Sequence, residues 1–316
     1  MKRILANDGL HPAGIAKLEA AGFTVDTNKI AQDDLPEQLT NYDVVLVRSA
    51  TKIRQPLIDG CPNLKIIGRG GVGLDNIDVD HAKSKGVEVY NTPAASSRSV
   101  AELAMGHALN LSRFLHLSNR EMPTQGNTEF KVLKKNYSAG IELKGKTLGV
   151  IGFGRIGQQT ALMALGMGMK ILPTDPYVEE ATIALDLEHG AALSATVKTV
   201  SMEAMLAEAD VITLHVPSSD KPVLGAGEMT KMKDGVILIN ASRGGTIDED
   251  ALLAALESGK VGGAGLDVFV GEPAPRDELI NHPRISVSPH IGAATGQAQA
   301  NIGIELADKI IAYFAD

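Results

Sequence analysis

A glycine-rich turn constrains the fold of this chain more than any other feature. Residues 148–157 read LGVIGFGRIG, a short apolar strand that runs into the pattern G-x-G-x-x-G. In such a turn Gly152 permits the tight bend, Gly154 lets the backbone approach a pyrophosphate, and Gly157 lets helix and strand pack closely. The helix N-terminus then offers free N–H groups to the phosphates. The pattern predicts a dinucleotide-binding unit, although a glycine-rich turn without a ligand would read the same.

An acidic residue downstream favours one cofactor. Asp175 follows the second predicted strand of this unit, 18 residues beyond Gly157. There a carboxylate can accept hydrogen bonds from the adenosine ribose hydroxyls, and its charge repels the extra phosphate of NADP. The alternative is an ordinary turn aspartate before Pro176. Together with the glycine pattern, Asp175 predicts NAD as the cofactor.

The rest of the chain alternates short apolar runs with segments of helical period, which is typical of parallel sheets built from βαβ units. The fold class is therefore α/β. Continuous apolar runs in the second half suit strands that helices cover on both faces. The predicted strands are Arg3–Ala6, Val44–Val47, Lys65–Gly68, Val87–Tyr90, Thr147–Gly152, Met169–Thr174, Val211–His215, Val236–Asn240, Gly263–Asp267 and Ile285–Ser288, and helices are predicted at Pro12–Ala21 and Gln55–Gly60.

The pattern changes near residue 96, where we expect a second domain to begin. Ser99 and Glu102 form a capping-box pattern in front of an apolar helical stretch that runs to about Arg113. Residues 118–142 are polar and weakly periodic, which indicates a surface segment or an arm. A glycine-rich turn after the last strand leads into a closing helix at Thr295–Tyr313.

Composition and charge exclude several function classes. The net charge of −8 argues against a general phosphate-backbone binder, so no nucleic-acid partner is expected. The one cysteine, Cys61, cannot form an intrachain disulfide, and nothing resembles a Cys/His metal cage, so no metal is expected. No run of 18 apolar residues occurs, and the apolar start is too short for a signal peptide. We expect a cytoplasmic protein with no membrane partner.

Three later segments each place a charged or titratable residue just after an apolar strand. They supply Arg243, Glu272 and His290. Open α/β sheets bind ligands outside the carboxyl ends of their strands, so the three side chains could converge on one cleft. Taken singly, each has an ordinary explanation: a structural histidine, a solvated Gly-Glu-Pro turn and a surface ion pair.

With the glycine turn upstream, the segments 240–245, 267–273 and 288–295 resemble the D-2-hydroxyacid dehydrogenase family, and most closely its phosphoglycerate dehydrogenase branch. The segments VRSATK at 47–52 and GRGGVGLDNID at 68–78 extend the likeness to the front of the chain. The resemblance implies two Rossmann-like domains. A doubly wound NAD-binding domain at 96–288 would be inserted into a smaller flavodoxin-like substrate domain at 1–95 and 289–316.

The resemblance also implies that Arg243, Glu272 and His290 are catalytic, and the residue types suit the chemistry. Oxidation of a secondary alcohol needs a base that titrates near neutrality, which fits His290. A neighbouring carboxylate, Glu272, would orient the imidazole and favour its protonated form. The guanidinium of Arg243 offers paired N–H donors to a substrate carboxylate and can polarise the adjacent oxygen.

By the same resemblance, further residues are expected to line the ligands, with Asp267 near the nicotinamide amide. The expected cofactor residues are Val72, Gly152, Gly154, Arg155, Ile156, Gly157, Asp175, His215, Val216, Pro217, Ala241, Ser242, Arg243, Asp267, His290, Gly292 and Ala293. The expected substrate residues are Arg48, Ser49, Arg69, Gly71, Val72, Gly73 and Ser96.

Local charge supports a phosphorylated small-molecule substrate. Residues 41–70 hold five basic side chains against two acidic ones, a balance of +3 in a chain of −8. Arg48 and Arg69 match positions where the phosphoglycerate dehydrogenases place arginines near the substrate phosphate, although a solvated basic face is the alternative. The implied activity is NAD-dependent oxidation of D-3-phosphoglycerate to 3-phosphohydroxypyruvate, the first step of serine biosynthesis. A hydroxypyruvate or glyoxylate reductase, and an NAD-sensing binding module without turnover, remain alternatives.

The sequence departs from the family at three places. Ser96 stands where asparagine is common, which puts one substrate contact in doubt. Residues 126–130 lack the tryptophan common there. The chain ends at Asp316, so the C-terminal regulatory domain of longer members, and feedback through it, are expected to be absent. Family likeness suggests a homodimer formed by the cofactor domains, with the Ser99–Arg113 helix and the arm after it at the interface.

Overall fold

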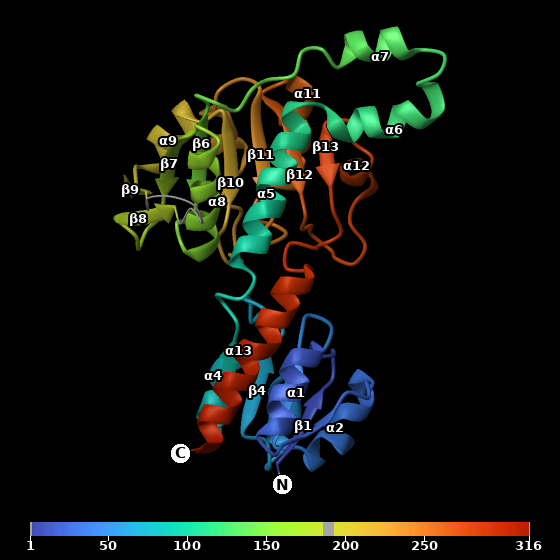
Figure 1. Cartoon of the computed structure of the whole chain (residues 1–316), viewed down its shortest axis with the longest axis vertical. Coiled ribbons are helices and arrows are strands. Elements are labelled where there is room, and N and C mark those ends of the chain that lie inside the picture. Colours follow the sequence, from blue (N-terminus) through green and yellow to red (C-terminus); the bar gives the residue numbers. More distant parts are fainter. Residues whose placement is uncertain (1, 186–192, 316) are drawn as a thin grey trace. The chain divides into compact units, whose positions relative to one another are not determined.

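The computed structural model describes residues 2–185 and 193–315 and divides the chain into two units (Figure 1). One unit comprises Met1–Ser97 and Ala293–Asp316, and the other comprises Arg98–Gly292. The division differs by two to four residues from the expected boundaries at 95/96 and 288/289. Residues 289–292 belong to the second unit, where the carboxylate of Asp267 accepts the backbone N–H groups of Ile291 and Gly292.

The first unit is a five-stranded parallel sheet in the order β2-β1-β3-β4-β5, which fits the flavodoxin-like domain that the family resemblance implied. Its strands are β1 (Arg3–Ala6), β2 (Thr24–Asp26), β3 (Val44–Val47), β4 (Ile66–Arg69) and β5 (Glu88–Asn91). Its helices are α1 (Pro12–Ala20), α2 (Leu35–Gln38), α3 (Gln55–Asp59), α4 (Val79–Ser84) and α13 (Gly296–Ala315), with short 3₁₀ helices at Gln32–Asp34 and Leu39–Asn41.

Both faces of this sheet are buried, as the continuous apolar strands require. On β3, Val44 and Leu46 face a core shared with α1 and α13, whereas Val45 and Val47 face a core shared with α2, α3 and α4. A Cβ placed on Gly14 of α1 would lie 2.6 Å from the backbone of α13, so glycine lets the two helices approach closely.

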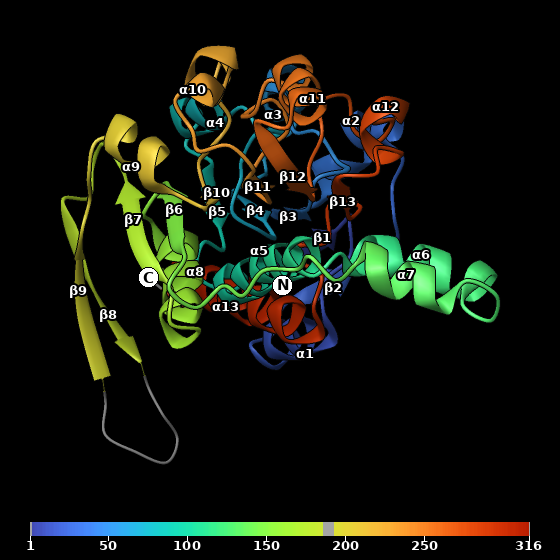
Figure 2. The same ribbon diagram turned by 90° about the horizontal axis from the view of Figure 1, so that it is seen from above.

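The second unit is a six-stranded parallel sheet in the order β7-β6-β10-β11-β12-β13 (Figure 2). Its strands are β6 (Thr147–Ile151), β7 (Lys170–Thr174), β10 (Val211–Leu214), β11 (Val236–Asn240), β12 (Val261–Leu266) and β13 (Ile285–Val287). Its helices are α5 (Ser97–Ser112), α6 (Leu115–Gln125), α7 (Phe130–Asn136), α8 (Arg155–Gly166), α9 (Met202–Glu208), α10 (Ala226–Thr230), α11 (Glu249–Ser258) and α12 (Asp277–Ile280).

The α/β class and the doubly wound sheet are confirmed, with one local difference. In the six-stranded order 3-2-1-4-5-6 a parallel strand lies outside the second one. In the described part of this chain, the segment after β7 instead forms an antiparallel pair, β8 (Glu180–Leu185) and β9 (Leu193–Lys198). These strands and β2 were not predicted. The ten predicted strands form within two residues of their expected ends.

Glycines in β12 let α5 lie directly on the sheet. A Cβ on Gly263 would lie 3.1 Å from Leu111, and one on Gly265 would lie 2.6 Å from His107. The predicted capping box at the start of α5 is wrong, because the helix begins at Ser97. Glu102 instead accepts a hydrogen bond from Arg98, and the Ser99 hydroxyl donates to the carbonyl of Gly292 at 2.7 Å.

The polar segment after α5 folds as two helices, α6 and α7, that project away from the sheet (Figures 1 and 2). We call residues 115–136 the arm. Leu133 is buried, whereas Leu115, Met122, Phe130 and Val132 are exposed. Among the described residues, no helix is both long and apolar enough to cross a membrane.

Candidate active site

The glycine turn between β6 and α8 has the shape that a pyrophosphate site needs. Gly152 has a φ of 91°, and a Cβ on it would lie 2.5 Å from the carbonyl oxygen of His215. A Cβ on Gly157 would lie 2.2 Å from the carbonyl oxygen of Gly152, whereas one on Gly154 would meet no atom within 4 Å. Gly154 precedes α8, and no side chain caps its N-terminus. The turn is therefore closed on its protein side and open where phosphates would lie, so it fits a dinucleotide.

Asp175, just after β7, holds this turn in place. Its Oδ2 accepts the N–H of Phe153 at 2.7 Å, and its Oδ1 accepts the N–H groups of Tyr177 and Val178. Because a carboxylate oxygen can accept about two hydrogen bonds, Oδ2 can still receive one from a ribose hydroxyl. The contact with Phe153 is a second role that the sequence did not indicate.

His215, just after β10, lies against the same turn. Its Nε2 is 3.1 Å from the hydroxyls of both Thr160 on α8 and Thr213 on β10. Burial lowers the pKa of His215 to about 3, so the imidazole is neutral at physiological pH. Val216 also approaches the turn, since its Cγ1 would lie 3.0 Å from a Cβ on Gly152. The structure thus brings the expected residues of β10 to the glycine turn.

Arg243 lies on a turn after β11 that its neighbours hold tightly. The side-chain amide of Asn240 donates to the carbonyl of Arg243 and to the hydroxyl of Thr246, each at 3.0 Å. The guanidinium donates to the carbonyl of Ser242 at 2.7 Å. A Cβ on Gly244 would lie 2.1 Å from the carbonyl oxygen of Phe269, so this turn packs against the segment that follows β12.

Glu272 and His290 form a pair on the other side of Phe269. The Oε1 of Glu272 accepts the N–H of Phe269 at 2.9 Å, and its Oε2 lies 2.7 Å from Nδ1 of His290. Since an ionised carboxylate only accepts, the proton between them resides on Nδ1. In the neutral imidazole, Nε2 is then the atom that can take a proton. Arg243 and the Glu272–His290 pair therefore both belong to turns that contact the segment around Phe269, which follows β12.

Asp267 fixes the backbone on which His290 stands. It is buried, and its Oδ1 accepts the hydroxyl of Ser288 at 2.6 Å and the N–H of Ile291 at 2.8 Å. Its Oδ2 accepts the N–H of Gly292 at 2.8 Å. His290 itself has a left-handed φ of 54°, an uncommon conformation for a residue with a side chain. Oδ2 retains capacity for one further donor, which suits the expected place near a nicotinamide amide.

Comparisons with known proteins agree with this geometry. The family model for the NAD-binding domain of D-isomer specific 2-hydroxyacid dehydrogenases matches residues 105–292, more than half of the chain. The chain belongs to this family. It is an oxidoreductase, and its cofactor is NAD.

Two named relatives differ in their substrates. The chain is 46% identical over 292 residues to a hydroxypyruvate reductase of Thermotoga maritima, covering 90% of this chain and 89% of the relative. It is 41% identical over 313 residues to a D-3-phosphoglycerate dehydrogenase of Methanocaldococcus jannaschii, covering 98% of this chain but 57% of the relative. The chain thus spans little more than half the length of that second relative.

A solved structure covers both units of the chain. The NAD⁺-bound 3-phosphoglycerate dehydrogenase of Entamoeba histolytica has a TM-score of 0.77 and 28% identity, and the match covers 100% of this chain and 96% of that chain. A glyoxylate reductase structure gives a TM-score of 0.78 at 29% identity. The fold is therefore shared across dehydrogenases that are named for different substrates.

The expected substrate residues of this dehydrogenase lie in the first unit, at the carboxyl edge of its sheet. Arg69 ends β4, and Arg48 follows Val47, the residue of β3 that pairs with Arg69. A Cβ on Gly71 would lie 1.5 Å from Nη1 of Arg69, so the missing side chain makes room for this guanidinium. The Arg48 side chain is exposed.

The remaining expected residues of the dehydrogenase divide between the units. Val72 and Ala293, both expected at the cofactor, belong to the first unit with Ser49, Gly73 and Ser96. The hydroxyl of Ser96 is buried and has no hydrogen-bond partner in the described part of the chain. Arg155, Ile156, Pro217, Ala241 and Ser242 lie in the second unit with the glycine turn and the catalytic candidates.

Proposed function

We propose that this dehydrogenase interconverts D-3-phosphoglycerate and 3-phosphohydroxypyruvate with NAD, the reaction that begins serine biosynthesis. The observation that carries the substrate is the pair Arg48 and Arg69. Arg48 directly follows β3 and Arg69 ends the adjacent parallel strand β4, so both side chains start from one edge of the sheet. Guanidinium groups bind phosphate through paired N–H donors. A single carboxylate substrate does not need a second cationic site of this kind.

The second unit supplies the chemistry of oxidation. We propose that Nε2 of His290 removes the proton of the substrate hydroxyl while the C–H hydrogen leaves as hydride and the C–O bond becomes a carbonyl. NAD⁺, which the glycine turn and Asp175 would hold, would supply the hydride acceptor. Glu272 at Nδ1 stabilises the imidazolium that forms, because the carboxylate lies 2.7 Å away. Arg243 holds the substrate carboxylate and polarises the oxygen beside it. In the reverse direction His290 returns the proton.

A second candidate is a hydroxypyruvate reductase without a phosphate site. It is favoured by the Thermotoga maritima relative, which carries that name and matches nearly its whole length. The two candidates share the catalytic residues and differ in whether the arginine pair contributes to substrate binding.

One experiment distinguishes the two candidates. NADH oxidation is measured with 3-phosphohydroxypyruvate and with hydroxypyruvate, for the wild type and for Arg48→Ala, Arg69→Ala and Lys52→Ala. Hydrogen bonds to charged groups contribute about 1.5–3 kcal/mol, so each arginine variant is expected to lose roughly 10–150-fold in kcat/KM for the phosphorylated substrate, mainly through KM. Lys52 is the control, because its loss removes a positive charge from the same segment outside the proposed contact.

The variants should retain their activity toward hydroxypyruvate if the arginines hold the phosphate. A wild type that prefers hydroxypyruvate, or arginine variants that lose both substrates equally, would establish the reductase candidate instead.

We also propose a cytoplasmic homodimer formed through the second unit. A reducing compartment suits a chain whose one cysteine, Cys61, is buried. The arm presents Leu115, Met122, Phe130 and Val132 to solvent, which is apolar surface that an isolated chain leaves uncovered. Deleting residues 118–136 should convert a dimer to a monomer in light scattering.

A further inference from the structure

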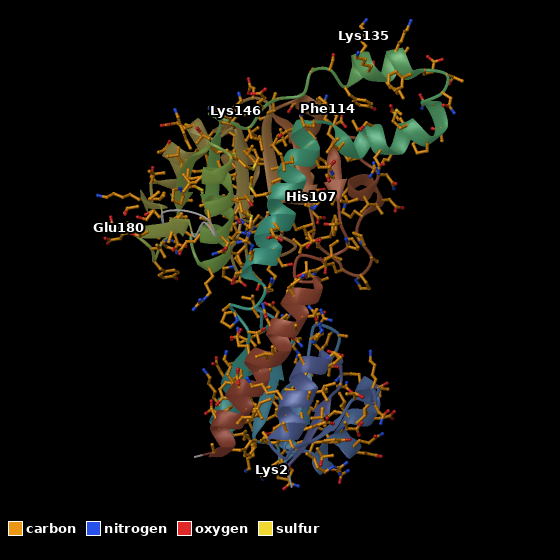
Figure 3. The ribbon with its side chains drawn as sticks, in the orientation of Figure 1. Lys2, His107, Phe114, Lys135, Lys146 and Glu180 are labelled. Carbon is orange, nitrogen blue, oxygen red and sulfur yellow. The ribbon has the colours of Figure 1, made fainter. Side chains whose placement is uncertain are left out.

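His107 is a buried histidine to which the proposed reaction assigns no role. It lies on α5, beside β12 and β13 (Figure 3), and is 5% exposed. Its ring has a dedicated space, since a Cβ on Gly265 of β12 would lie 2.6 Å from its Cβ and 2.9 Å from its Cγ. Both ring nitrogens have hydrogen-bond partners. The space that Gly265 leaves for the ring, and the hydrogen bonds at both ring nitrogens, indicate a role beyond packing.

The hydrogen bonds around His107 fix its tautomer. The Ser288 hydroxyl is 2.6 Å from Oδ1 of Asp267, which can only accept, so Ser288 donates its proton there. Ser288 must then accept from Nε2 of His107, 2.9 Å away, and Nε2 carries the hydrogen. On the other side, Asn110 donates to the Ser286 hydroxyl at 2.7 Å, and Ser286 lies 2.9 Å from Nδ1 of His107. Ser286 therefore donates to Nδ1.

The surroundings of His107 favour the neutral form of its ring. Burial lowers its pKa, the negative charge of Asp267 acts in the opposite direction, and His116 lowers it further. A neutral ring with its hydrogen on Nε2 satisfies every group in the series, whereas a protonated ring would turn Nδ1 into a donor and remove the acceptor of the Ser286 hydroxyl hydrogen.

The series ends at the backbone of the proposed base. Asp267 accepts the N–H groups of Ile291 and Gly292, the two residues that follow His290. His290 adopts its left-handed conformation there and meets Glu272 through Nδ1. The position of the imidazole thus depends on the orientation of the Asp267 carboxylate, which the Ser288 hydroxyl sets from inside the protein.

We propose that His107 is a positioning residue for the dehydrogenase reaction: as the neutral Nε2–H tautomer it orients Ser288, and through Ser288 and Asp267 it holds the turn that carries His290. This inference rests on the proposed role of His290. The inference means that α5, a 16-residue helix, helps to position the catalytic segments, which lie far from it in the sequence. Hydrogen bonds in such a buried series strengthen one another, so the loss of His107 or Ser288 should weaken the hydrogen bonds between Asp267 and the backbone after His290.

Nitrogen NMR of the protein labelled with ¹⁵N-histidine tests the tautomer without any turnover. The His107 signals are identified by their loss in His107→Gln. They should show a protonated Nε2 and an unprotonated Nδ1 that do not change between pH 6 and 8. A ring protonated on Nδ1, or one that titrates in that range, overturns the proposal.

Kinetics of three variants test the positioning role. His107→Leu and Ser288→Ala should each lower kcat about 10–100-fold with less than about threefold change in KM, whereas His107→Gln, whose amide can still donate to Ser288, should recover most of the rate. Leu111→Ala is the matched control, because it weakens the packing of the same helix without touching the series. A purely structural role predicts that His107→Leu resembles Leu111→Ala, with a lower melting temperature and a normal kcat.

Ser288→Ala keeps the test valid if His107→Leu does not fold. Where His107→Leu folds, the double variant His107→Leu/Ser288→Ala should be no slower than Ser288→Ala, because both changes act through one hydroxyl, and additive losses overturn the proposal. If His290→Asn retains turnover, the catalytic assignment fails, while the NMR result still reports on His107 separately.

Discussion

Replacing Glu272 by glutamine tests the pair of Glu272 and His290 that we propose carries out the proton transfer. The substitution keeps an oxygen that can accept the N–H of Phe269 and removes the negative charge 2.7 Å from Nδ1 of His290. The imidazolium then loses its counter-ion, whereas the neutral imidazole loses only an orienting hydrogen bond. The imidazole should therefore take the substrate proton less effectively, because the imidazolium that forms is less stabilised.

The exposure of the pair sets the size of the effect. The side chains of His290 and Glu272 are 47% and 34% exposed, so solvent screens their attraction substantially. We therefore expect the lost attraction to contribute only about 0.7–1.4 kcal/mol to the activation free energy. Together with the loss of orientation, it should lower kcat/KM by about 10–100-fold.

Glu249→Gln supplies the control for Glu272→Gln. Glu249 also accepts a backbone N–H of this loop, that of Val270 at 2.8 Å, and has no hydrogen bond or ion pair with His290. Initial rates of NADH formation from pH 5.5 to 9.5 compare the two variants with the wild type. An undiminished kcat/KM in Glu272→Gln, or an equal loss in Glu249→Gln, refutes the assignment of Glu272 to the pair.

Three further outcomes are expected. The kcat/KM for NAD should exceed that for NADP by at least about tenfold, since Asp175 and the following Glu179 and Glu180 repel a 2′-phosphate; equal use of both cofactors contradicts this. Burial lowers the pKa of His215 in the folded state to about 3, from an ordinary value near 6.5. The free energy of unfolding should therefore be highest above pH 6.5 and fall toward pH 3, with about 2 kcal/mol lost at pH 5. Urea unfolding of His215→Asn should lack this pH-dependent loss. Burial raises the pKa of Asp210, but hydrogen bonds from the Thr147 N–H and Lys233 outweigh it and leave the pKa lowered. Asp210→Asn should therefore reduce the free energy of unfolding by about 1–2 kcal/mol at pH 7, and by progressively less as the pH falls below 4.

The sequence predicted the parts of the fold that follow from periodicity. Strands such as Val44–Val47 and Val236–Asn240 form at the expected residues, because buried parallel strands need uninterrupted apolar runs. The pair β8 and β9 was not predicted, because its strands mix polar and apolar residues and are stabilised by each other. The start of α5 was misplaced, because Ser99 and Glu102 satisfy the capping pattern but form tertiary and lateral contacts instead.

In the candidate site, too, local sequence patterns predicted some residues and missed those that depend on tertiary contacts. Arg243, Glu272 and His290 were predictable because each follows an apolar strand at the edge where parallel strands end. The residues that hold them were not predicted: Asn240 and Ser288 are small polar residues with no distinctive spacing, and His107 precedes Ser288 by 181 positions. Such supports depend on how α5 lies on β12, which no local pattern encodes. The glycines of VGGAGL in β12 were the available signal, since a strand with three glycines indicates a close neighbour.

The most direct test of this account compares turnover with cofactor binding in His290→Asn. Asparagine keeps a hydrogen-bonding side chain but cannot act as a base near neutrality. If His290 is the base, kcat should fall at least about 10²–10⁴-fold, while the affinity for NADH, measured by its fluorescence, should stay within about threefold of the wild type. A variant that binds NADH normally and still turns over within about tenfold of the wild type would contradict the assignment of the base and the mechanism built on it.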